Sequence, residues 1–188
     1  MSKNSEEINF WSLKRIFYFP KLTTKKVCAL GLLIAITIVL SIMSGYLRIG
    51  NFSKLSVSFI SVFIAAYLFG GIAGGLVAAL ADIISCFINP VGAFLPQLTA
   101  IEFLYGFVFG LFFYKSKPKL YFITLLICDI FQFVANIILK TAILSSTYGA
   151  TFNSYFVTRL PMCIVQAIII LIVIILIKPF MKTFEKNL

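Results

Sequence analysis

The chain has 188 residues, of which 61% are hydrophobic and only 12% are charged, and its mean hydropathy is +1.07. Because a soluble domain is about 45–50% apolar and about 25% charged, this composition excludes an ordinary soluble domain and indicates one compact membrane domain. The absence of histidine excludes histidine-ligated metal sites and nucleophiles that need a histidine base, whereas the formal charge of +10 requires an explanation.

A short amphipathic segment precedes the first long apolar run. Ser5–Phe19 mixes aromatic and aliphatic residues with charges of both signs, which predicts a helix in the membrane interface, with a disordered tail as the alternative. Six apolar segments follow, and we interpret each as a transmembrane helix, because a span needs about 20 apolar residues. In chain order they are Val27–Leu47, Leu55–Phe69, Ile72–Ile88, Leu95–Tyr114, Leu120–Leu144 and Phe152–Ile177.

The predicted fold is therefore an all-α membrane protein with six transmembrane helices. The second and third segments are short and are separated only by Gly70-Gly71, so one long hairpin is the alternative there. The fifth and sixth segments are long, so these helices should tilt or project from the bilayer. We expect residues 1–24 to form a cytoplasmic or interfacial segment, residues 25–182 the transmembrane domain and residues 183–188 a cytoplasmic tail.

The basic residues predict the orientation of these helices. With a cytoplasmic N-terminus, most of the 16 Lys and Arg residues lie before the first segment, between the fourth and fifth, or after the sixth. All three regions are then cytoplasmic, as the excess of Lys and Arg in cytoplasmic loops requires. Both termini are therefore expected in the cytoplasm of a cell with this protein in its plasma membrane, and the positive charge needs no nucleic acid to explain it.

Five ionisable side chains lie within the apolar segments, namely Asp82, Glu102, Asp129, Lys140 and Arg159. A charge at bilayer depth costs at least a few kcal/mol, so such residues usually face an interior cavity and mark a ligand or ion pathway. In the predicted topology four of them lie in the outer half of their helices and the fifth lies near the middle. This placement predicts a binding pocket that opens to the outside.

Polar residues on the fifth segment form one stripe. Asp129, Gln132, Asn136 and Lys140 recur at helical spacing, so in lipid they must face protein or water. A structural hydrogen-bond network is the alternative to a binding role, and Asp82 or Asp129 could serve only to neutralise Lys140 or Arg159. As a ligand site, Arg159 and Lys140 suit an anion, because guanidinium pairs with carboxylate or phosphate through two hydrogen bonds.

Small residues at four-residue spacing indicate close helix contacts. They recur through Ala66–Ala79, where packing within this chain is the simpler interpretation, and again at Gly31 and Ala35. The second pair lies among modest side chains, where docking of another helical protein is plausible. The segment Asn89–Pro96 is rich in Pro and Gly and predicts either an ordinary turn or a lid over the pocket.

Motifs for catalysis are missing from the sequence. It contains no Gly-rich loop ending in GK[ST], no HExxH and no GxSxG, so we expect neither an enzyme nor a transporter that hydrolyses ATP by itself. We also expect no cofactor and no bound metal.

The order of several motifs is similar to that in a known family. Leu47-Arg48-Ile49, Ala79-Leu80-Ala81-Asp82, the segment Asn89–Pro96 and Leu104-Tyr105-Gly106 together resemble the substrate-binding S components of energy-coupling factor (ECF) transporters. Thr141–Ser145, followed by Arg159-Leu160-Pro161, resembles the folate-specific branch. The resemblance extends over most of the chain from about Val27 onward.

This resemblance implies a protein that captures folate or a related water-soluble vitamin from outside the cell. The family partners are a transmembrane T component, which would contact Gly31 and Ala35, and two cytoplasmic ATPases that drive import. Together with the residues discussed above, the resemblance leads us to predict a vitamin pocket. Its residues are Asp82, Phe94, Thr99, Glu102, Gln132, Asn136, Lys140 and Arg159. Arg159 and Lys140 would hold ligand carboxylates, and Asp82 or Glu102 would accept hydrogen bonds from a ring.

The sequence departs from the folate pattern at a few positions. Ile143 stands where that branch usually has Trp, Met162 and Cys163 replace Lys-Gln, and Glu102 replaces a small residue. A pocket that loses a Lys and gains a Glu should bind the carboxylates of folate less strongly.

Other functions remain open. The chain could be an S component for another vitamin, such as pantothenate, pyridoxine or a thiamine precursor, or an ion-coupled transporter in which Asp82, Glu102 and Asp129 carry protons. An intramembrane enzyme would need a nucleophile and base that are not recognisable here, and a helical adaptor would bind no small molecule.

Overall fold

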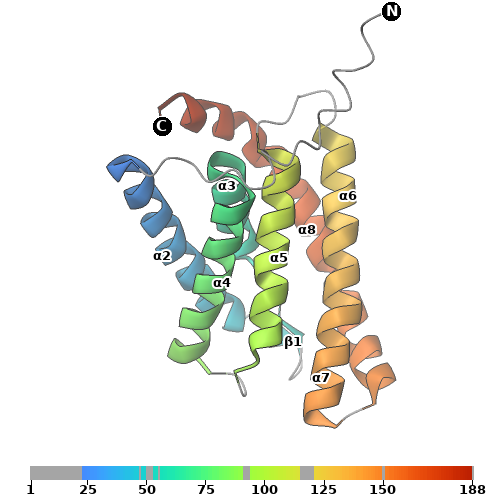
Figure 1. Cartoon of the computed structure of the whole chain (residues 1–188). Helices are drawn as coiled ribbons and strands as arrows, with labels where there is room; N and C mark the ends of the chain where they lie inside the picture. Colours follow the sequence, from blue (N-terminus) through green and yellow to red (C-terminus); the bar gives the residue numbers. More distant parts are fainter. Residues whose placement is uncertain are drawn as a thin grey trace, which may run out of the picture.

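The computed structural model describes residues 23–46, 48–49, 53–54, 56–90, 94–114, 121–149 and 151–187. The predicted interfacial helix Ser5–Phe19 lies outside these residues, as do most of the basic residues used above to predict the orientation. The described residues form a bundle of helices with one very short strand pair (Figure 1).

The helices in chain order are α2 (Thr24–Tyr46), α3 (Phe59–Phe69), α4 (Gly71–Ile88), α5 (Pro96–Phe113), α6 (Tyr121–Val134), α7 (Lys140–Tyr148) and α8 (Phe152–Asn187). A π-helical turn, Ala135–Leu139, joins α6 to α7 without a break. Between α2 and α3, strands β1 (Arg48–Ile49) and β2 (Ser53–Lys54) pair antiparallel.

Five helical segments are long and apolar enough to cross a membrane, which confirms the predicted all-helical membrane fold at this level. They are Thr24–Tyr46, Gly71–Ile88, Pro96–Phe113, Ile123–Tyr148 and Phe152–Ile177. The second predicted span is shorter than we expected, because α3 has only 11 residues. At 1.5 Å per residue this helix is about 16 Å long, against a hydrocarbon core of about 30 Å.

The N-terminal end of α3 explains this difference. We expected the helix to begin near Leu55, but the backbone N–H groups of Ser56 and Val57 donate to the side chains of Gln166 (2.9 Å) and Ser44 (2.9 Å). These two backbone N–H groups bond to distant side chains and not to carbonyl groups of a preceding helical turn, so α3 begins only at Phe59. The helix ends at Gly70, which has φ = 93° and separates it from α4.

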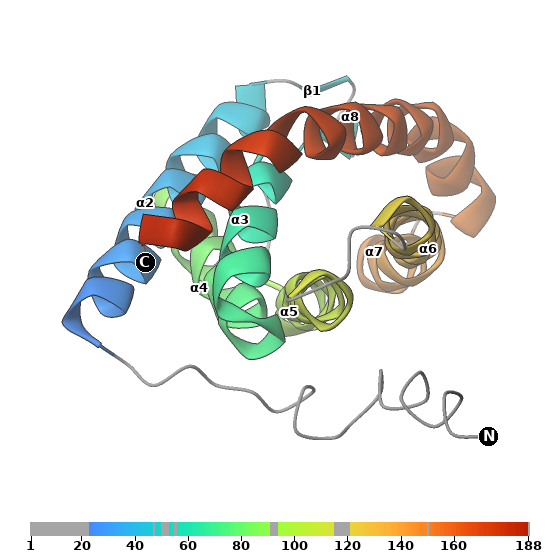
Figure 2. The ribbon, with the colours of Figure 1, turned by 90° about the horizontal axis from the view of Figure 1, so that it is seen from above.

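The short helix α3 lies in the interior of the bundle, with α2, α4, α5 and α8 around it in the view from above (Figure 2). Its residues Phe59, Phe63 and Ala66 are buried and belong to a core cluster that also draws side chains from α5, α6 and α8. The Phe63 ring meets Phe109 and Phe113 edge-on, with centroids 5.6 and 5.1 Å apart. Such edge-to-face pairs are a favourable aromatic arrangement.

Glycines allow α4 and α5 to pack backbone to backbone. A Cβ placed on Gly74 would lie 2.8 Å from the carbonyl oxygen of Gly106, and one on Gly75 would lie 2.9 Å from that of Phe103. A Cβ on Gly110 would collide with the backbone of Gly71. The small-residue pattern around Ala66–Ala79 is thus used for packing within this chain, as its simpler interpretation predicted.

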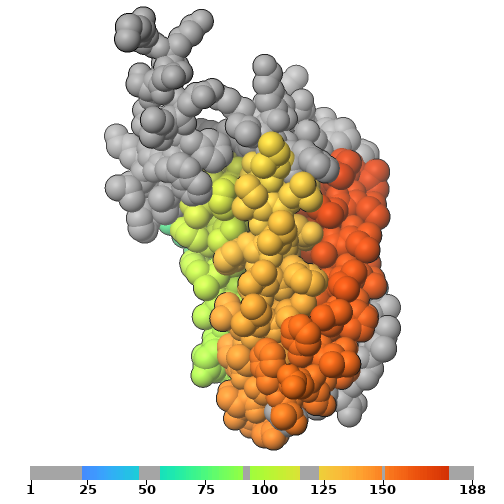
Figure 3. All heavy atoms as spheres, turned by 90° about the vertical axis from the view of Figure 1, so that its right-hand side faces the viewer, coloured from blue at the N-terminus to red at the C-terminus, as the bar shows by residue number. Residues whose placement is uncertain are grey.

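The remaining helices complete the bundle on the other side. The segments α5, α6–α7 and α8 lie next to one another across one face (Figure 3). In the view from above, α8 curves along the bundle from α7 towards α2 (Figure 2). Because α8 continues to Asn187, it enters the predicted C-terminal tail. The predicted domain boundaries themselves remain predictions.

Candidate functional site

A cavity of about 350 Å³ lies among the helices, on the side of the bundle where α4 ends and α5 begins. Its lining comes from all the helices from α2 to α8, from the π-helical turn and from the connections that lead into α3 and α5. This volume falls in the range of small-molecule sites, about 300–1,000 Å³. Seven of the eight predicted site residues line it, namely Asp82, Phe94, Glu102, Gln132, Asn136, Lys140 and Arg159.

The π-helical turn keeps the polar stripe pointed at this cavity. Residues four apart on an ideal α-helix drift by about 40° per step, so Gln132 and Lys140 would diverge by about 80°. The turn Ala135–Leu139 lies between them and contains more residues per turn, which offsets this drift. Gln132, Asn136 and Lys140 all line the cavity as a result. The Asn136 side-chain amide also donates to the backbone carbonyl oxygen of Gln132 (3.1 Å).

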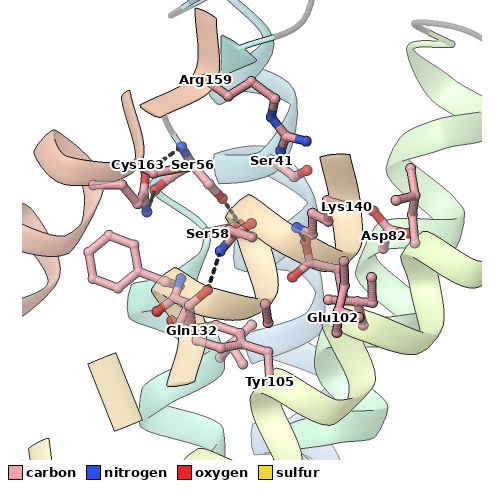
Figure 4. A pocket seen from close by; sticks show the side chains of 18 of the residues that line it. Ser41, Ser56, Ser58, Asp82, Glu102, Tyr105, Gln132, Lys140, Arg159 and Cys163 are labelled. Atoms are coloured by element: carbon pink, nitrogen blue, oxygen red, sulfur yellow. Dashed lines mark hydrogen bonds and ion pairs between the residues drawn. The ribbon is translucent and has the colours of Figure 1, made fainter. Parts of the chain in front are cut away.

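Lys140 forms an ion pair with Glu102. Its Nζ lies 2.5 Å from Glu102 Oε1, and the two side chains are 16% and 31% exposed (Figure 4). Asp82 and Asp129 are the sequence-based candidates for neutralising Lys140, but the structure pairs Lys140 with Glu102 of α5 instead. Glu102 is one of the positions that depart from the folate pattern. The residue that differs there is thus the ion-pair partner of Lys140.

Asp82 is supported by Thr99. The Thr99 hydroxyl donates to Asp82 Oδ2 at 2.8 Å and joins α4 to α5. Thr99 is 8% exposed and lies outside the cavity lining, unlike the other predicted site residues. Its position suits a residue that orients Asp82 rather than one that touches a ligand.

Arg159 supplies the other cation of the cavity. It extends from α8, and its Nη1 lies 3.5 Å from the hydroxyl of the buried Thr141. Among the described residues Arg159 makes no ion pair, in contrast to Lys140. Its guanidinium group is therefore available to an anionic ligand.

Two further polar residues, Tyr105 of α5 and Asp129 of α6, line the cavity beside Gln132. Tyr105, Asp129 and Gln132 are each only 7% exposed. The Tyr105 hydroxyl, Asp129 Oδ1 and Gln132 Oε1 lack a hydrogen-bond partner among the residues that the structure describes. Tyr105 lies beside Gln132 and near Asp129, so the three form one group.

A glutamine of α8 fixes the segment that enters α3. Gln166 accepts a hydrogen bond from the Ser56 N–H (2.9 Å) and donates through Nε2 to the Ser56 carbonyl oxygen (2.6 Å). One amide thus satisfies both backbone groups of Ser56, as a neighbouring strand would. Gln166 and Ser56 both line the cavity, so this pair shapes its wall.

Phe94 closes part of the cavity at the connection between α4 and α5. Its ring stacks on Phe87, with centroids 5.9 Å apart and an angle of 26° between the planes, and the side chain is 41% exposed. Residues 91–93 of the predicted lid lie outside the described residues. The gating role of this connection therefore stays a prediction.

The sequence contained signals for the residues that our prediction left out of the site. Tyr105 follows Glu102 by three residues, Asp129 precedes Gln132 by three, and Gln166 follows Arg159 by seven. Each spacing places the missed residue on the face of a predicted site residue. Within the described part of the chain, no group of three or more Cys, Asp or Glu side chains is arranged to hold a metal ion.

Comparison with known proteins provides an independent description of the chain. The model of the family "ECF transporter, substrate-specific component" matches residues 25–178. The folate transporter FolT of Clostridium novyi (strain NT) is 32% identical over 127 residues, which cover 68% of this chain and 70% of that protein. The FolT of Leuconostoc mesenteroides subsp. mesenteroides is 27% identical over 135 residues, or 71% of each chain.

A solved structure has the same arrangement of helices. The crystal structure of FolT bound with folic acid matches 80% of this chain and 90% of its own, with a TM-score of 0.72 and 28% sequence identity. The resemblance inferred from the motifs between Leu47 and Pro161 is thereby confirmed.

Proposed function

This chain belongs to the family of substrate-specific components of ECF transporters, and we propose that it captures folate at the outer face of the plasma membrane for ATP-driven import. Its partners in this function are a transmembrane T component and two cytoplasmic ATPases, which supply the energy that the chain itself cannot. The proposal includes six helices in the membrane, with both termini in the cytoplasm and the short α3 enclosed by the other helices.

The observation that carries this proposal is the distribution of charge in the cavity. Arg159 has no ion-pair partner among the described residues, and Lys140 is the second cation. Folic acid ends in a glutamate with two carboxylates, and guanidinium binds carboxylate through two parallel hydrogen bonds. We assign the carboxylates to Arg159 and Lys140, and the other cavity residues to the rest of the ligand. Two of the relatives compared are folate transporters, which favours this ligand.

The ion pair with Glu102 favours a second candidate ligand. Because Glu102 already neutralises Lys140, only Arg159 is left to bind an anion without competition. This balance suits a vitamin with one carboxylate, such as pantothenate, better than the two carboxylates of folate. The second candidate changes the ligand and leaves the transport role unchanged.

The proposed contact with the T component uses the exposed face of α2. A Cβ built on Gly31 meets nothing within 4 Å, and Ala35 is also exposed. In a membrane, two small residues four positions apart allow another helix to approach closely. Gly31 and Ala35 therefore offer a place where the T component can dock without displacing side chains of this chain.

Binding to the purified protein tests the ligand assignment. We expect folic acid to bind, and Arg159→Ala to raise its Kd roughly 10- to 100-fold, because a hydrogen bond to a charged group contributes about 1.5–3 kcal/mol. Thr158→Ala is the matched control, since the Thr158 hydroxyl donates to the Ser154 carbonyl of its own helix and lies outside the cavity lining.

Three results would contradict the proposal. An unchanged Kd for folic acid in Arg159→Ala would remove Arg159 from the site. Binding of pantothenate with no competition from folic acid would select the second candidate. Uptake into liposomes that contain this chain alone, driven by an imposed ion gradient, would instead support an ion-coupled transporter.

A further inference from the structure

Three buried polar groups at the inner wall of the cavity have unmet hydrogen-bonding capacity. They are the Tyr105 hydroxyl, Asp129 Oδ1 and Gln132 Oε1, and none has a partner among the described residues. Buried polar atoms in native proteins are nearly always hydrogen-bonded, so three orphans in one place need an explanation. Because all three residues line the cavity, a ligand can supply the missing partners.

The other carboxyl groups of the cavity are already engaged. Asp82 accepts a hydrogen bond from Thr99, and Glu102 accepts one from Lys140. We had expected Asp82 or Glu102 to accept hydrogen bonds from a ligand ring, but Asp129 is the acid with an oxygen still to be satisfied. All three orphan atoms are oxygens, and two of them, Asp129 Oδ1 and Gln132 Oε1, can only accept, so their complement is a group rich in N–H donors.

The location of these groups matches one end of an elongated ligand. In Figure 4, Tyr105 and Gln132 lie at the opposite end of the view from Arg159, with Lys140 between those ends. The Tyr105 ring packs edge-on against Phe109, with centroids 4.7 Å apart, so this end of the cavity rests on the hydrophobic core. A flat ring system suits such a wall, whereas a charged tail suits Arg159.

We propose that Tyr105, Asp129 and Gln132 form a subsite that accepts hydrogen bonds from the amino-substituted edge of a ligand heterocycle. The proposal rests on the proposed function, because folic acid carries a 2-amino-4-oxo ring whose amino group and ring N–H lie side by side. Such an edge has the spacing of a guanidinium group and can donate to both oxygens of one carboxylate. Asp129 receives this pair, and Gln132 and Tyr105 bind the remaining polar atoms of the ring.

A pair of ligands that differ at one atom tests the subsite. Binding to the purified chain is measured with folic acid and with its 2-oxo analogue, in which the amino group is replaced by a carbonyl oxygen. We expect the wild-type protein to prefer folic acid roughly 10- to 100-fold, because the analogue turns a donor towards the Asp129 carboxylate into an acceptor. In Asp129→Asn the new amide can donate to that oxygen, so the preference should fall to near unity.

Asp82→Asn makes the same chemical change on the other cavity aspartate. It can lower the affinity for both ligands, but it should keep the wild-type preference between them. In Tyr105→Phe, which removes one hydroxyl, affinity for folic acid should fall roughly 2- to 10-fold. A thermal melt of each variant shows whether it is folded.

The outcomes separate this proposal from the proposed function. Wild-type protein that binds neither ligand would overturn the folate assignment itself. Wild-type protein that binds both ligands equally would overturn only the subsite and would assign the three polar groups to internal water. The subsite is also wrong if the preference collapses in Asp82→Asn and persists in Asp129→Asn.

Discussion

Two helices of this chain carry small residues at close spacing, and the structure places them in opposite surroundings. On α4, a Cβ at Gly74 or Gly75 would press into the backbone of α5. On α2, a Cβ at Gly31 would meet nothing within 4 Å. The comparison teaches that this sequence pattern marks a helix that can be approached closely, but does not identify the helix that approaches.

The difference lies in the partner helix. The small residues of α4 meet Gly106 and Gly110, which lie four residues apart on α5 and remove the side chains from both sides of the contact. Around Gly31 no described helix contributes such a surface. The small residues of α4 therefore pack against α5 within this chain, whereas Gly31 of α2 is left for contact with another protein.

The strongest way to break the comparison is to add a side chain to the α4–α5 contact. In Gly106→Leu the Cβ would fall on the backbone of Gly74 and 2.9 Å from the Gly75 nitrogen. Overpacking costs about 1–3 kcal/mol even where neighbouring side chains can move away. Here the neighbouring atoms belong to the backbone, which cannot move away in this manner. We expect a loss of at least about 3 kcal/mol in the free energy of unfolding in mixed micelles, which would abolish folic acid binding. A stable, ligand-binding variant would show that the two helices separate without cost.

The corresponding change on α2 should affect transport and leave the chain folded. Gly31→Leu adds a side chain where the chain has open space, so the melting temperature and Kd for folic acid should match wild type. Uptake by the assembled transporter should fall at least about tenfold, because the docking helix could no longer approach closely. Ile130→Phe, which enlarges a 62% exposed side chain on α6, is the control that should transport normally. Normal uptake by Gly31→Leu would exclude this face as the docking site.

The same contrast shows what the sequence could predict. The apolar runs predicted the five segments that are long enough to cross a membrane, and Gly70 and Gly149, which adopt positive φ, mark the ends of α3 and α7. The polar stripe and the embedded charges located the cavity, because charge is tolerated in lipid only where it faces an interior. These are properties of one helix at a time, so they can be read from local sequence.

Relations between helices could not be predicted in this way. The pairing of Lys140 with Glu102 depends on how α5 and α7 are rotated relative to each other, and 38 residues separate the two side chains in the chain. The short α3 depends on Gln166, which is 110 residues from Ser56. Thr99 shares a helix with Glu102 but lies outside the cavity lining, and its hydroxyl donates to Asp82 of another helix.

The smallest expected effect concerns the hydrogen bond that connects the two compared helices. The Ser41 hydroxyl of α2 donates to the Ser85 hydroxyl of α4 at 3.2 Å. Interhelical hydrogen bonds in membranes contribute about 0.6 kcal/mol on average, so Ser85→Ala should lower the free energy of unfolding in mixed micelles by about that amount. Ser145→Ala, which removes a hydroxyl bonded only to the Ala142 carbonyl of its own helix, is the control. A loss near that of Gly106→Leu would show that the Ser85 hydroxyl contributes far more than an average interhelical hydrogen bond. A loss of the expected size would make this bond an ordinary interhelical hydrogen bond and leave the glycine contact of α4 with α5 as the larger contribution to stability.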